Sequence, residues 1–316
     1  MNARPRFARP AWLVARFAGG VLLGLVALRT FLLAAELSSP AEHAAEEIPA
    51  LPSAARASEV TVGFVTLANA DVPGIHVAQG LGMSNVAIAF RVAVIQHPEG
   101  TLIFGGAPSG ASAPAGSGLW NPFGEVRASQ PLGDLPSATA GWVIPNTRWY
   151  LSQVARESTI RPLWVSGREY GLAVSGPTPF RYGIEAGAWA SIPGLRQMPM
   201  RATGPGALQQ KVWDVFGDRS VLALGVRTTG WEETMVLVTL ANGQRVLLVS
   251  DLVWTQGQLD AQAPRSILAG LLLDRNRSGA LSLMRQLDAL EESGQIRVIA
   301  LLDGSAELPV WPDALL

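Results

Sequence analysis

The sequence predicts an α/β (α+β) fold: an αββα sandwich of two mixed β-sheets with outer helices, preceded by a hydrophobic N-terminal helix. Three observations predict it. Short apolar, β-branched segments alternate with segments of helical periodicity in both halves of the chain. The dipeptide Asn242-Gly243 separates two apolar runs, as in a tight β-hairpin. The 316 residues are 48% hydrophobic, enough to fill a core between two sheets.

The first half of the domain begins with strands. Its segments are rich in Val, Ile and Phe, and the turn "PEG" joins two of them. A run of small residues, "GGAPSGASAPAGSG" at 105–118, predicts a loop. The expected strands are 60–67, 85–97, 101–104, 138–145 and 162–166, and the expected helices are 147–158, which opens after Pro145, and 167–174.

The second half repeats this alternation. A strand pair is expected over 211–226, with its turn at Gly217-Asp218. The hairpin of 233–254 follows, because both residues of its Asn-Gly turn tolerate positive φ. Helical periodicity then predicts two helices, and an apolar run predicts the last strand. These final elements are the helices 263–275 and 279–292 and the strand 295–303.

Composition excludes several classes of function. The formal net charge is −1, so no global field recruits nucleic acid, and we expect no nucleic-acid partner. There is no cysteine, which excludes disulfides, thiol nucleophiles and thiolate metal sites. The three histidines, His43, His76 and His97, have no ligand-like spacing, whereas a catalytic zinc normally needs several converging imidazoles. We interpret each as a surface or turn residue.

The N-terminus has the pattern of a signal anchor. Residues 1–16 carry four arginines and no acidic residue, and an apolar run follows. The stretch 11–35 exceeds the ~20 residues that span a bilayer, and Arg29 near its far end can extend its charge to the interface. Residues 34–47 contain no A-x-A pair for a signal peptidase. The sequence therefore predicts a retained anchor, and export after cleavage is the alternative.

This pattern divides the chain into three regions. Residues 1–36 are the signal anchor or transmembrane segment, 37–59 are a Pro/Ala-rich linker, and 60–316 are the folded domain. Because a basic flank stays in the cytoplasm, we expect the C-terminal domain to lie outside it. The membrane is then a partner through the N-terminal helix.

Four stretches of the domain resemble, in order and spacing, the metallo-β-lactamase fold, especially its lactonase-like hydrolase branch. "AVIQHPEGTLIFGGAPSG" is similar to the early hairpin with an Asp-Thr-Gly turn, and "WVIPNTRWYLSQV" to the loop that carries H-x-H-x-D-H. "VWDVFGDRSVLALGVRTTGWEETMVLVTLANGQRVLLVSDLVWT" is similar to the segment with the next histidine and the bridging aspartate. "IRVIALLDGSAELPVWP" is similar to the last strand, which ends in His-Asp. The resemblance covers residues 60–312 and implies a dinuclear zinc hydrolase.

Carried over position by position, almost all of the family's ligands are replaced. The bridging carboxylate is kept as Asp251, the early turn's aspartate falls on Gly105, and Asp303 keeps the aspartate after the last histidine. A zinc-activated hydroxide needs several deprotonated ligands and an open position, and guanidiniums repel a divalent cation. We therefore expect no bound metal and no other cofactor. The former metal-site positions are Asn146, Arg148, Tyr150, Leu151, Arg227, Asp251 and Leu302.

The replacements allow two interpretations of the former centre. In one, an arginine fills the metal void and pairs with Asp251, with Glu232 or Glu233 nearby. In the other, two arginines grip the carboxylate or phosphate of a small anionic ligand. Tryptophans at the rim then line its pocket, although such residues are more often core residues. The residues of this candidate ligand site are Arg148, Arg227, Asp251, Trp149, Trp231 and Trp254.

We therefore expect a membrane-anchored, non-catalytic binding or scaffold protein, a pseudoenzyme whose partner is an unknown protein or a small anionic ligand. The alternative is a metal-dependent hydrolase of ester or lactone substrates with an altered site, which rests on the fold resemblance. A third hypothesis is metal-independent chemistry with Asp251 or Asp303 as the base and Arg148 as an electrostatic clamp. Stoichiometric zinc in the purified protein separates the first two.

Overall fold

The fold is known from a computed structural model. It describes residues 49–53, 59–108, 121–129, 135–175, 184, 187, 189–204, 208, 211–227, 232–274, 276–313 and 315–316, together with Ala27 and Thr30. Within these ranges, the side chains of Arg227, Leu268, Leu271 and Leu272 are not described.

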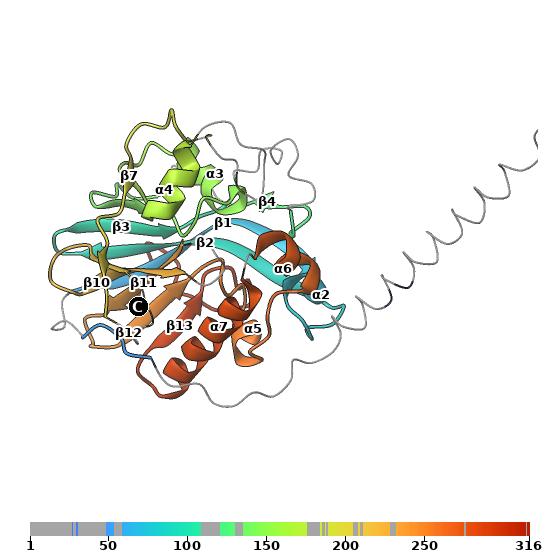
Figure 1. Cartoon of the computed structure of the whole chain (residues 1–316). Coiled ribbons are helices and arrows are strands. Elements are labelled where there is room, and N and C mark those ends of the chain that lie inside the picture. The colour runs from blue at the N-terminus through green and yellow to red at the C-terminus, as the bar shows by residue number, and fades with distance from the viewer. Residues whose placement is uncertain are drawn as a thin grey trace, which may run out of the picture.

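A seven-stranded mixed sheet forms one half of a sandwich (Figure 1). Its long β1–β2 hairpin and β3 are antiparallel, whereas β5, β6 and β7 continue from β3 in parallel. The order across the sheet is β4-β1-β2-β3-β5-β6-β7. The strands are β1 (Thr61–Pro73), β2 (Asn85–His97), β3 (Gly100–Gly105), β4 (Arg127–Ala128), β5 (Gly141–Val143), β6 (Leu163–Val165) and β7 (Leu195–Gln197).

A six-stranded sheet in the order β13-β12-β11-β10-β9-β8 forms the other half. Its strands pair antiparallel except for β12 and β13, which are parallel. The tight turn between β11 and β12 is the predicted hairpin, with Gly243 at φ 82°. The strands are β8 (Arg201–Ala202), β9 (Lys211–Asp214), β10 (Val221–Arg227), β11 (Glu232–Thr239), β12 (Arg245–Val249) and β13 (Arg297–Ala300).

Helices cover the outer faces of both sheets. Figure 1 shows α3 and α4 outside the seven-stranded sheet, and α5 and α7 outside the six-stranded one. α7 buries Leu283, Leu287 and Leu290, whose helical spacing makes one apolar stripe. The helices are α2 (Gly74–Val77), α3 (Trp149–Glu157), α4 (Gly167–Val174), α5 (Gln256–Asp260), α6 (Ile267–Leu273) and α7 (Arg277–Glu292).

The main core lies between the two sheets. Phe64 of β1 and Ile95 of β2 pack in one cluster with Val236 of β11 and Leu248 of β12, and all four are at most 2% exposed. Full burial of such a side chain stabilises the fold by roughly 1.5–3 kcal/mol. Facing sheets with outer helices are the architecture that the apolar pattern predicts, so the αββα sandwich is confirmed.

Several elements differ from the sequence prediction. The predicted helix 263–275 begins only at Ile267, because Pro264 and the Ser266 cap precede it, and Ser266 Oγ accepts from Ala269 N at 3.1 Å. The predicted strand 138–145 pairs only over Gly141–Val143. The sequence analysis missed α2, α5, β4, β7 and β8, all of which have five residues or fewer and therefore give no readable periodicity.

The end of the predicted linker contacts the domain. Leu51 packs against the cluster under α7, Leu208 N donates to Ala50 O at 3.3 Å, and Arg245 Nη2 donates to Pro52 O at 2.8 Å. Apart from Ala27 and Thr30, the predicted anchor lies outside the described residues. Within the described part of the chain, no helix has the length and apolar character needed to cross a membrane.

Candidate functional site: a buried ionic cluster

Asp251, the position that the resemblance matches to the family's bridging carboxylate, lies two residues after the end of β12 and is 0% exposed. Three neutral groups donate to its carboxylate. Asn146 Nδ2 lies 2.9 Å from Oδ2, while Tyr150 Oη and Trp254 Nε1 each lie 3.0 Å from Oδ1. The structure therefore brings together three of the positions that the sequence analysis assigned to a metal site, together with Trp254, which it placed at the rim.

Two guanidiniums complete the surroundings of Asp251. Arg148 forms an ion pair with Oδ2 through Nη1, and Arg265 Nη2 lies 3.3 Å from Oδ1. Arg265 also donates to the Asp251 backbone carbonyl and to Asp274 Oδ1, the latter at 2.7 Å. Its guanidinium carbon lies 5.0 Å from the centre of the Trp254 ring. An Arg148–Asp251–Arg265–Asp274 chain of alternating charge results, which we call the ionic cluster.

The loop between β5 and α3 fixes Arg148. Asn146 Oδ1 accepts from the Arg148 backbone N–H at 3.1 Å, an Asx turn that sets up the start of the helix. Thr147 donates to Glu169 Oε2 through its backbone N–H at 2.8 Å and through Oγ1 at 2.5 Å. Arg148 Nη2 then donates to Leu273 O at 2.7 Å, so this side chain connects α3 to the end of α6.

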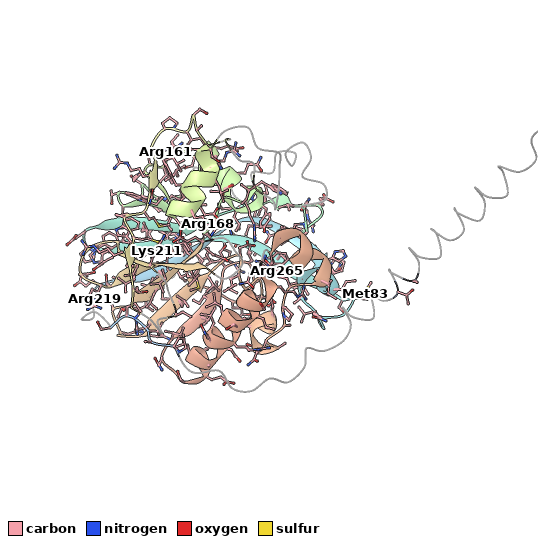
Figure 2. All side chains as sticks on the ribbon, in the orientation of Figure 1. Met83, Arg161, Arg168, Lys211, Arg219 and Arg265 are labelled. Atoms are coloured by element: carbon pink, nitrogen blue, oxygen red, sulfur yellow. The ribbon has the colours of Figure 1, made fainter. Side chains whose placement is uncertain are left out.

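The segment before α6 fixes Arg265. Ala78 and Arg265 form an isolated antiparallel bridge, and Gln79 N donates to Pro264 O at 3.0 Å. The α2 turn of the β1–β2 hairpin thus covers the segment that carries Arg265. Figure 2 shows Arg265 beside α6, at the junction with the sheets. Backbone pairing on this side leaves the guanidinium only 3% exposed.

Glu233 adds a third carboxyl group to the surroundings. It lies on β11, is 2% exposed, and its Oε1 has no hydrogen-bond partner among the described residues. Burial raises the pKa of Glu233 from 4.5 to about 7, against the opposing effect of Arg265, Arg148 and the Leu252 backbone N–H. Burial also raises the pKa of Glu169 and of Tyr150, although Arg148 opposes both.

The remaining predicted positions lie apart from the charged groups or outside the description. Leu151 and Leu302 are buried in an apolar cluster, as is Trp149, whose Nε1 finds no partner among the described residues. The backbone of Arg227 ends β10, but its side chain and the whole of Trp231 lie outside the description. A role for Arg227 or Trp231 therefore stays a prediction.

Asp303 and Gly105 have local structural roles. Asp303 accepts from Gln256 N at 2.8 Å and from Ser305 Oγ at 2.6 Å, so its carboxylate organises a turn. Gly105 has φ 116°, and a Cβ there would lie 2.7 Å from Arg91 O. The position of the family's early aspartate is thus closed to any side chain in this backbone conformation.

Sequence reasoning missed Arg265, Asp274 and Glu169. Arg265 is the cation that pairs with Asp251 beside Arg148, in the place where Arg227 was expected to contribute. The available signal for Arg265 was its position directly before the apolar stretch "SILAGLLL". A charged side chain next to a buried helix needs an oppositely charged partner. Glu232, expected near Asp251, instead lies 2.8 Å from Lys211 Nζ, whereas Glu233 does lie beside the arginines.

The residues of this centre do not fit a dinuclear metal. Guanidiniums have no acceptor lone pair for a metal, and both carboxylate oxygens of Asp251 already accept hydrogen bonds or ion pairs. Nowhere in the described part of the chain do three or more His, Cys, Asp or Glu side chains converge as metal ligands would. The donor set suits a fixed ion-pair network, in which each buried charge has an opposite neighbour.

Comparisons with known proteins agree with the architecture. No protein-family model and no curated protein matches the sequence. Among solved structures, a Bacillus thuringiensis AiiA variant with N-decanoyl-L-homoserine bound is similar at 15% identity and a TM-score of 0.57, over 80% of this chain and 98% of that one. A quorum-quenching N-acyl homoserine lactone lactonase is similar at 12% identity and 0.58, over 82% and 99%.

A probable metal-dependent hydrolase from Staphylococcus aureus is similar at 9% identity and a TM-score of 0.52, over 83% of this chain and 98% of that one. At such identities the likeness establishes the architecture alone. Together with the strand order and the outer helices, it shows that this chain has the metallo-β-lactamase fold.

Proposed function

We propose that this chain is a non-catalytic metallo-β-lactamase-fold protein, anchored in a membrane by its N-terminus, whose domain acts as a binding or scaffold module outside the cytoplasm. In this proposal the ionic cluster holds the former centre closed. The partner is a protein or a small ligand, and no metal takes part.

The saturation of Asp251 is the observation that carries the proposal. This carboxylate is 0% exposed and is contacted by Asn146, Arg148, Tyr150, Trp254 and Arg265. Metal-assisted hydrolysis needs ligands with free lone pairs and an open coordination position for water. A base needs a free oxygen within reach of substrate. Asp251 offers neither, which argues against the zinc hydrolase and against Asp251 as the base of a metal-independent reaction.

The same contacts bear on the anion-site interpretation. Arg148 already donates to Asp251, Tyr150 and Leu273 O. An anion at Arg148 would have to displace one of these buried partners, so the interpretation in which a guanidinium fills the metal void has the stronger support. We therefore look for the binding function outside the ionic cluster.

The membrane anchor has its support in the basic flank and in the apolar stretch 11–35. Because residues 49–53 contact the six-stranded sheet, only residues 37–48 remain to connect anchor and domain. A fully extended chain spans at most ~3.5 Å per residue, so the domain would lie within about 40 Å of the bilayer.

Turnover assays on the full chain in detergent test the proposal. Homoserine lactones, simple esters and a β-lactam are offered with and without added zinc, and the expected result is no hydrolysis above a buffer blank. Zinc-dependent hydrolysis that disappears in Asp251→Asn would instead establish the hydrolase alternative. Hydrolysis that a chelator leaves intact but Asp251→Asn abolishes would establish metal-independent chemistry.

A further inference from the structure

A cavity of about 520 Å³ opens at the C-terminal end of α3, apart from the ionic cluster. Its walls are the loop 135–138, which leads into β5, and the segment 157–161, which joins α3 to β6. Figure 2 shows Arg161, one of its wall residues, well away from Arg265. Its volume falls in the range of roughly 300–1,000 Å³ typical of small-molecule sites.

Arg161 presents a fixed, partly free guanidinium to this cavity. Its Nε donates to Pro193 O at 2.5 Å, and its Nη1 donates to Ser158 O and Ile160 O at 2.6 Å each. These three carbonyls hold the side chain in place, but none of them carries a negative charge. In the described part of the chain, Nη2 has no partner and no carboxylate pairs with this arginine. A positioned cation with a free N–H is ready to bind an anion without further ordering.

Glu157 supplies the opposite charge on the same wall. It is the last residue of α3, is exposed, and forms no ion pair with Arg161 or with any other described residue. Ser137 and Thr159 add hydroxyl groups, while Leu135 and Ile160 add apolar surface. The cavity thus combines a cation and an anion, neither of which is ion-paired to a described residue, with an apolar wall.

Another cavity, of about 390 Å³, lies beside β13, and its charged wall residues are Glu291, Arg297, Asp303 and Glu307. Two of its three carboxylates are used within the protein. Glu291 accepts from Val298 N and from Gln256 Nε2 at 3.0 Å each, and Asp303 accepts from Gln256 N and Ser305. Among the described residues, no group holds the exposed side chain of Arg297 as the three carbonyls hold Arg161, so a ligand there would have to order this cation on binding.

We propose that the cavity at the end of α3 binds a small zwitterion with an apolar side chain, of the size and chemistry of a free α-amino acid. The ligand carboxylate accepts from Arg161 Nη2, its ammonium group faces Glu157, and its side chain contacts Leu135 and Ile160. Both charges of the ligand are required, because neither wall charge has an ion-pair partner among the described residues. The site goes beyond the proposed function and does not depend on the ionic cluster being inert.

Calorimetric titration of the full chain in detergent tests this site with three probes. They are L-leucine, leucinamide, which lacks the carboxylate, and 4-methylpentanoate, which lacks the ammonium group. Saturable binding of leucine at millimolar concentration, at least tenfold tighter than either analogue, is expected. Absence of saturable leucine binding, or equal binding of all three probes, would overturn the proposal.

Variants then locate the binding. Ser137→Trp fills the cavity from an exposed position and leaves the Arg161 side chain unsubstituted, and we expect it to abolish leucine binding while the melting temperature is kept. Arg161→Gln should weaken leucine binding at least tenfold and leave leucinamide binding unchanged. Arg156→Gln, a matched arginine change in α3 at a residue that does not line the cavity, should bind leucine like the wild type. Leucine binding that survives Ser137→Trp would contradict the assignment.

Discussion

Glu233 offers the sharpest stability test, because one buried carboxyl group links the ionic cluster to pH. The perturbation is Glu233→Gln, which keeps the shape of the side chain and mimics its protonated form. Burial raises the pKa of Glu233 from 4.5 to about 7, so the folded protein holds this proton more tightly than the unfolded chain does. The stability contributed by this proton is complete below pH 4.5 and is lost as the pH rises through 7.

The magnitude follows from the same pKa. A tenfold change in proton affinity corresponds to about 1.4 kcal/mol. The wild type should therefore lose about 3 kcal/mol of unfolding free energy from this group between pH 4.5 and pH 8. Glu233→Gln should lack that loss and should be the more stable protein at pH 8 by about the same amount. Glu169, whose pKa is also raised, is present in both proteins and cancels in the difference.

Urea unfolding of wild type and Glu233→Gln across this pH range provides the assay, with stability taken from the midpoint and slope. The exposed Glu125→Gln is the matched control and should follow the wild type at every pH. A difference between wild type and Glu233→Gln that does not change with pH would refute the reasoning. So would a Glu233→Gln variant that is less stable than the wild type at pH 8.

Three further substitutions test the packing around the cluster by chemical denaturation. Asp251→Asn should lower the free energy of unfolding by about 3–5 kcal/mol, because it leaves Arg148 and Arg265 buried without their shared partner. A loss below ~1 kcal/mol would contradict this expectation. Trp254→Phe removes one hydrogen bond to Asp251 and should cost about 1–2 kcal/mol. Gly106→Ala should lower the free energy of unfolding by about 1–3 kcal/mol, because the added Cβ would lie 1.6 Å from Leu151 O. An unchanged free energy of unfolding would show that the loop moves to make room for the methyl group.

Much of the fold could be predicted from the sequence because its signals are local. The Asn242-Gly243 turn fixed one hairpin by backbone conformation alone, and α7 showed its apolar stripe at helical spacing. β7 and β8 could not be predicted in this way. They are two or three residues long and pair with β6 and β9 through tertiary contacts that no local pattern reveals.

The part of the candidate site that could be predicted consists of residues whose positions follow from the order of the elements along the chain. Asp251, Arg148, Asn146 and Tyr150 meet as their places in the chain suggested. Arg265 was missed because its role depends on α2, which pairs with the Pro264–Arg265 segment across the fold. The charges of Glu157 and Arg161, which form no ion pair with a described residue, were equally hidden, because a sequence does not show which charges remain unpaired.

Metal content tests the central claim most directly. The full chain is purified without chelator and analysed by elemental mass spectrometry, before and after addition of zinc, and its melting temperature is measured in both states. The ionic cluster predicts far less than one equivalent of zinc and an unchanged melting temperature, because a ligand that binds the folded state would raise it. One or more equivalents of zinc, with a higher melting temperature, would contradict the claim that guanidiniums have replaced the metals.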